Sequence, residues 1–232
     1  MAANDETIRD MNAVDARDGE RAVRYAQTVL SATVGTGSIP DPPEDAGALS
    51  GERGAFVTLE KDESLRGCIG RPYPRQPAVE AVRQATIDAA TTDPRFPAVS
   101  PPELNEISIE VSLLTRPVPV SGSGEGVPES ISVGRDGLIV RSDGKSGLLL
   151  PQVPGDHGWD VETFLTQTCR KAGLPGDCWR DESSSVERFR AQVFAETRPN
   201  GPIEAIRPTG RTENVGPNES FDIGEGDLAP EP

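Results

Sequence analysis

The amino-acid sequence predicts an α+β fold built around a largely antiparallel sheet. The chain combines apolar positions at helical spacing with the apolar–polar alternation of strands, and it lacks the regular strand–helix–strand order that a parallel sheet requires. Its 232 residues are 34% hydrophobic. That content is enough for the core of one large domain or two small ones.

Three segments have the spacing or the end signals of helices, namely residues 19–34, 78–90 and 159–172. The third of them has Asp160 near its start and Gly173 just past its end. Further short strands joined by Asp-Gly turns are expected between residues 131 and 151. Longer strands are expected at residues 55–60, 65–69, 107–114 and 186–196.

Both ends of the chain lack such periodicity. Residues 1–17 are mostly polar, and residues 199–232 are rich in glycine, proline and acidic side chains. Both segments are therefore expected to be mobile tails. The folded part is expected to span residues 18–198.

The chain is strongly acidic, with a formal net charge of −15 and a pI of about 4.5. Nucleic acid and anionic membranes are not expected as partners, because binding them needs clustered positive charge. Only three of the 23 basic residues are lysines: Lys61, Lys145 and Lys171. Abundant carboxylates with few lysines indicate a halophile, in which concentrated cytosolic salt screens the charge; a mesophilic acidic protein is the alternative.

The cysteines Cys68, Cys169 and Cys178 are an odd number without a repeated CxxC spacing. No apolar leader is present, and no run approaches the roughly 20 apolar residues of a transmembrane helix. A reduced, cytoplasmic setting without disulfides is therefore expected. The single histidine, His157, gives no zinc-site spacing, and phosphate-loop and dinucleotide motifs are absent, so no metal and no cofactor are expected.

The segment Leu65-Arg66-Gly67-Cys68-Ile69-Gly70 is the most informative part of the sequence. Alternation along a strand places Arg66 and Cys68 on one face and the apolar Leu65 and Ile69 on the other. A nearby guanidinium favours the thiolate, which is the reactive form of cysteine, so this pair is a candidate catalytic site. The alternative is a small buried cysteine that is inert.

An inward-facing Arg66 needs an anionic partner. Glu110 is the candidate, because it also lies opposite the apolar positions of its strand. The two side chains are expected within salt-bridge distance, which makes Glu110 the third candidate catalytic residue. A purely structural pair is the alternative.

Four further residues are candidates for binding. Asp93, Arg95 and Phe96 lie in a loop stiffened by prolines, which suits a binding site. Alternatively, Phe96 fills the core while Asp93 caps and Arg95 is solvated. Trp159 opens the third predicted helix, and the neighbouring His157 is interpreted as an incidental loop histidine.

The hexapeptide, preceded by Gly54-Ala55-Phe56-Val57-Thr58-Leu59, resembles the hallmark of the AMMECR family. The resemblance covers about residues 18–196. It implies a larger α+β part built from both ends of the chain and a smaller β-rich lobe inserted at about residues 121–154, but it implies little about activity. Further blocks in family order are Asp93 to Pro97, Ile107 to Leu114, Gly137 to Val140, Gly147 to Val153, Gly158 to Asp160 and Phe189 to Glu196.

Two classes of function are open on these residues. The first is a non-catalytic binding or scaffold protein with a groove around the hexapeptide strand, whose partner is a small anionic ligand or another protein. The absence of a clear general base favours it. The second is an enzyme that uses Arg66 and Cys68, or, as the resemblance implies, an accessory subunit of a modification pathway.

Overall fold

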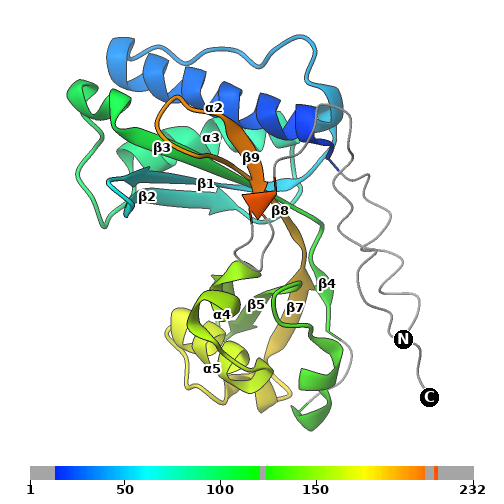
Figure 1. The fold of residues 1–232 in the computed structure, drawn as a ribbon. Coiled ribbons are helices and arrows are strands. Elements are labelled where there is room, and N and C mark those ends of the chain that lie inside the picture. The colour runs from blue at the N-terminus through cyan, green and yellow to red at the C-terminus, as the bar shows by residue number, and fades with distance from the viewer. Residues whose placement is uncertain (1–13, 121–123, 207–211, 214–232) are drawn as a thin grey trace.

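The structure, a computed structural model, describes residues 14–120, 124–206 and 212–213 and divides into two lobes, each with its own antiparallel sheet (Figure 1). The sheet of the larger lobe has the strand order β10-β9-β8-β3-β1-β2. This arrangement confirms the predicted α+β class with antiparallel pairing. The strands are β1 (Gly54–Lys61), β2 (Ser64–Arg71), β3 (Ile107–Leu114), β8 (Ala191–Glu196), β9 (Ile203–Ile206) and β10 (Thr212–Glu213).

Helices α2 (Ala16–Thr36) and α3 (Ala78–Thr91) cover one face of this sheet (Figure 1). Asp15 caps the start of α2, because its side chain accepts a hydrogen bond from the Asp18 N–H at 2.7 Å, and Gly37, in the left-handed conformation, caps its end. Burial of the apolar rows between helices and sheet is the main stabilising contribution in this lobe. The buried side chains include Val23, Val29, Val57, Leu59, Val82, Ile109 and Val111.

The smaller lobe holds a second sheet in the order β4-β7-β5-β6. Helix α5 (Val161–Lys171) packs on β5 and β6, and the short α4 (Gln152–His157) connects β6 to α5. The lobe thus extends from β4 to β7, beyond the expected residues 121–154. Its strands are β4 (Val118–Pro119), β5 (Gly137–Ser142), β6 (Lys145–Leu149) and β7 (Ser185–Phe189).

The chain passes between the lobes after β3 and again between β7 and β8. The segment 186–196, predicted as one strand, is therefore two strands in different sheets. The two crossings lie side by side, because the Thr115 N–H donates to the Arg190 carbonyl and the Arg190 N–H donates to the Thr115 hydroxyl, each at 2.9 Å. Both residues are buried.

The two cysteines of the smaller lobe, Cys169 and Cys178, form a disulfide, so the expectation of reduced thiols was wrong for them. The chain turns back after α5 and brings their Cα atoms to 6.1 Å. Both lie in the core of this lobe beside Trp179. Their spacing matches no motif, which is why the sequence did not indicate the pairing. Cys68 is a free cysteine.

The folded part reaches into both segments that were expected to be tails. α2 begins before residue 18, and β9 and β10 lie beyond residue 198. The rest of the expected tails, residues 1–13, 207–211 and 214–232, lies outside the described residues.

No helix in the described part of the chain combines the length and the apolar character that crossing a membrane would require.

Replacing Gly67 by alanine should test the close packing of β2 on α3. A Cβ atom at Gly67 would overlap the backbone carbonyl of Ala89, which cannot move aside as a flexible side chain could. We expect Gly67→Ala to lower the free energy of unfolding by about 1–3 kcal/mol in denaturant titrations. Gly35→Ala is the matched control, because Gly35 lies in α2 with open space around it. Equal stability of the two variants would contradict this packing.

Candidate functional site

A β-bulge in β2 decides where the side chains of the hexapeptide point. β1 and β2 pair regularly as far as Leu59 and Gly67, and the next pair is Glu60 with Leu65, so Arg66 is an extra residue. The bulge breaks the strict alternation that the sequence suggested. Leu65, expected on the core face, is 42% exposed.

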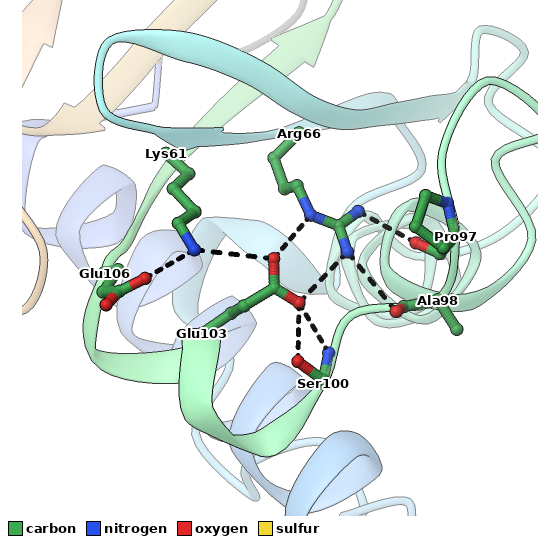
Figure 2. Close-up of polar contacts among 7 residues, drawn as sticks. All are labelled: Lys61, Arg66, Pro97, Ala98, Ser100, Glu103 and Glu106. Carbon is green, nitrogen blue, oxygen red and sulfur yellow. Dashed lines mark hydrogen bonds and ion pairs between the residues drawn. The ribbon is translucent and has the colours of Figure 1, made fainter.

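Arg66 is held by the loop between α3 and β3 (Figure 2), and the expected contact with Glu110 is not made. Its Nε and Nη2 atoms donate to the two carboxylate oxygens of Glu103, at 2.8 and 3.2 Å. Its Nη1 and Nη2 atoms also donate to the carbonyl oxygens of Pro97, at 2.9 Å, and Ala98, at 3.3 Å. The predicted Arg66–Glu110 ion pair is therefore wrong, because the bulge redirects the arginine.

Glu103 lies in a short 3-10 helix, η2 (Pro101–Asn105), and was missed by the sequence reasoning. Its carboxylate also accepts hydrogen bonds from the Ser100 N–H and hydroxyl, at 2.9 and 2.8 Å. The hydrogen bond from Arg66 is the main cause that lowers the pKa of Glu103 to about 2. The available signal was the capping-box spacing of Ser100 and Glu103. Lys61 adds a second cation, 3.8 Å from Glu103 (Figure 2).

Asp93 and Arg95 cover the outer edge of β2 at Cys68. The Cys68 N–H donates to Asp93 at 2.8 Å, and Arg95 Nη2 donates to the Cys68 carbonyl at 3.1 Å. Arg95 also donates to both oxygens of Asp93, which holds the pKa of that carboxyl well below its usual range. The two side chains therefore satisfy backbone groups that an edge strand would otherwise expose. Phe96 lies beside them, with the Arg95 guanidinium carbon 5.4 Å from its ring centre.

Cys68 and Glu110 lie on the face of the larger sheet opposite α2 and α3. Thr58 on β1 is the register partner of both, so the three residues form a row across adjacent strands, here called the open-face row. The Thr58 hydroxyl donates to the Cys68 sulfur at 3.4 Å. Burial raises the pKa of the Cys68 thiol, which disfavours the reactive thiolate.

Glu110 is half-buried, and its carboxylate accepts one long hydrogen bond from the Ser112 hydroxyl, at 3.5 Å. Burial is the main cause that raises the pKa of Glu110 to about 7, and the negative charges of Glu60 on β1 and Asp156 on α4 act in the same direction. No lysine or arginine among the described residues contributes a compensating charge to it. Asp156 belongs to the smaller lobe, and Leu114, on the same face of β3 as Glu110, lies in the apolar cluster of the junction, so the open-face row lies beside the place where the two lobes meet.

Trp159, the fourth predicted binding residue, belongs to the smaller lobe. It packs against the core of the smaller lobe and stacks on His157, with ring centres 4.6 Å apart. His157 ends α4, where a loop was expected. Within the described ranges, no group of three or more histidine, cysteine or acidic side chains is arranged to hold a metal ion.

The fold and the site define a two-lobed α+β protein with a half-buried polar row between its lobes. The AMMECR1 family model matches residues 23–194, and the chain belongs to this family. A protein of Thermococcus gammatolerans is 51% identical over 191 residues, which cover 80% of this chain and 93% of the relative. Protein TK0174 of Thermococcus kodakarensis is 50% identical over the same shares.

A solved structure extends the likeness to three dimensions. The crystal structure of the uncharacterized protein PH0010 from Pyrococcus horikoshii matches with a TM-score of 0.80 and 46% sequence identity. The match covers 84% of this chain and 98% of that chain. The two-lobed arrangement is therefore shared with an experimentally determined relative.

Glu103→Gln should lower the stability of the protein and make that stability depend less on pH in the acid range. The pKa of Glu103 is lowered from its ordinary value of 4.5 to about 2. Its carboxylate therefore contributes its full stabilisation above pH 4.5, and this contribution is lost as the pH falls through about 2. We expect the free energy of unfolding at pH 7 to fall by about 2 kcal/mol. The decline of stability between those two pH values should also be shallower than in the unmodified protein.

Glu106→Gln is the matched control for this change. Glu106 pairs with Lys61 at the surface, and its side chain is 55% exposed, so little stability depends on it. Denaturant titrations at several pH values would compare the two variants. Identical pH profiles for both would refute the anchoring role of Glu103.

Proposed function

We propose that this protein binds a small ligand through the open-face row, and that the hexapeptide shapes this face without carrying out chemistry. Glu110 carries the proposal. It is a half-buried carboxyl group with one long hydrogen bond and a raised pKa. Keeping such a group without a strong partner costs free energy, and such groups are concentrated at functional sites.

The charges near Glu110 favour a ligand that donates hydrogen bonds or carries a positive charge. Glu60 and Asp156 both add negative potential at this carboxyl. The small anionic ligand suggested by the sequence is less well supported, because the Arg66 guanidinium meant to hold it is engaged with Glu103. A protein partner that presents a lysine or an amide could make the same contact with the Glu110 carboxyl group.

An enzyme that uses Arg66 and Cys68 is also less well supported. The guanidinium contacts Glu103 and two carbonyl groups, and the thiol pKa is raised by burial. The second candidate is an enzyme that transfers a proton through Glu110, because a pKa of about 7 suits a general acid or base. Rapid alkylation of Cys68 in the folded protein would instead favour thiol chemistry.

We also infer that the protein works in a salt-rich cytoplasm. The net charge of −15 and the three lysines among 23 basic residues support this setting. Molar potassium chloride should raise the thermal unfolding midpoint, because salt screens the repulsion between carboxylates. An unchanged or lower midpoint in salt would contradict a halophilic origin.

Small fragments that donate hydrogen bonds should bind at the open-face row. We expect primary amines and amides, added to nitrogen-15-labelled protein, to shift the amide signals of Thr58, Cys68 and Glu110. Glu110→Gln should lower the affinity for amines, measured from these shifts, about tenfold or more, since a charge-assisted contact is lost. The measurement is a titration of amide chemical shifts with each fragment.

Matched carboxylic acids are the control ligands, and Glu106→Gln is the control variant. The acids should cause no such shifts, because they meet like charge at Glu110. Glu106→Gln should bind amines as the unmodified protein does, because Glu106 lies at the surface in contact with Lys61. Equal shifts in Glu110→Gln and the unmodified protein would contradict the proposal. So would amine-induced shifts confined to other parts of the chain.

A further inference from the structure

A polar cluster joins the two lobes beyond the end of β2. Tyr73 follows β2, and its hydroxyl donates to the Glu187 carboxylate on β7 at 2.7 Å. Arg141 on β5 lies over the Tyr73 ring, with its guanidinium carbon 4.6 Å from the ring centre and its Nε atom 3.9 Å from Glu187. Tyr73, Arg141 and Glu187 are here called the interlobe clamp.

The Tyr73 end of the interlobe clamp lies away from the line of the two chain crossings, whereas Glu187 lies on β7, the strand that runs into one of them. The crossings leave from β3 and β8, whereas Tyr73 follows β2, which is two positions from β3 in the sheet. At about 4.8 Å per strand, that offset is roughly 10 Å. Paired crossings at Thr115 and Arg190 resist separation of the lobes, but they permit rotation about their common line. A third contact at a distance from this line fixes the rotation.

Close packing of apolar side chains at the junction also restricts the lobe angle, and the clamp adds a contact of defined direction. The hydrophobic effect depends on buried area and has no preferred direction. A hydroxyl that donates to a carboxylate makes a short and directional bond. Burial and the contact with Glu187 raise the pKa of Tyr73, so its hydroxyl keeps the donated proton at neutral pH. The apolar side chains of the junction include Phe56, Leu114, Ile139, Leu148, Leu150, Phe189 and Val193.

We propose that the interlobe clamp sets the angle between the lobes and thereby controls access to the open-face row. α4 of the smaller lobe carries Asp156, which acts on Glu110 across the junction. A change in the lobe angle therefore changes the surroundings of Glu110. The effect on ligand access rests on the proposed function, whereas the lobe angle can be measured without any ligand.

Residual dipolar couplings of backbone amides test the clamp in the full chain. In the unmodified protein, we expect one alignment tensor to fit the couplings of both lobes. Tyr73→Phe removes only the hydroxyl, and Glu187→Gln removes the charge while keeping the shape. Both should require a separate tensor of reduced magnitude for the smaller lobe. The carboxyl titration of Glu110 should also move from near 7 toward 4.5, because separation of the lobes hydrates it.

Tyr25→Phe is the matched control, because the Tyr25 hydroxyl donates to the Pro40 carbonyl within the larger lobe. It should leave the single tensor unchanged. A single tensor in folded Tyr73→Phe and Glu187→Gln would overturn the clamp, whatever the fragment titrations show. Separate tensors with an unchanged Glu110 midpoint would overturn the link to the open-face row. If Tyr73→Phe does not fold, Glu187→Gln decides alone.

Discussion

The two-pronged contact of Arg66 with Glu103 is the interaction on which the hexapeptide region depends. It is made by the extra residue of a β-bulge, and it joins β2 to the loop before β3. The Arg66 side chain is 11% exposed, so removing Glu103 would leave a largely buried charge without its main partner. The same loop carries Asp93 and Arg95, which occupy the backbone groups of Cys68. The contacts of the hexapeptide thus protect and position an edge strand.

This use of Arg66 leaves Glu110, at one end of the open-face row, without a cationic partner among the described residues, whereas Arg95 lies at the other end beside Cys68. Cys68 and Thr58 contact each other, and Glu110 has the Ser112 hydroxyl as its hydrogen-bond donor. In a chain with 23 basic residues, a half-buried carboxyl group of raised pKa is costly to maintain. A binding role for this face accounts for that cost, whereas a role in edge protection does not.

The sequence predicted the fold class because helical and strand periodicities are properties of local residue order. Alternation also placed Cys68 and Glu110 relative to their apolar neighbours. It failed at Arg66, because one inserted residue reverses the side-chain direction and leaves no mark in the apolar pattern. Alternation also could not show that residues 186–196 divide between two sheets, because the break at Arg190 leaves no signal in the local residue order. The Cys169–Cys178 disulfide depends on a chain reversal that local residue order does not reveal.

A carbon-13 titration of the Glu110 side-chain carboxyl tests the central claim most directly. The absence of a cationic partner, together with burial and the charges of Glu60 and Asp156, predicts a midpoint near 7. Glu103 in the same sample provides the internal comparison, because its contact with Arg66 predicts a midpoint near 2. A Glu110 midpoint at or below 4.5 would show that this carboxyl is paired or well hydrated, and it would contradict the account of the open-face row.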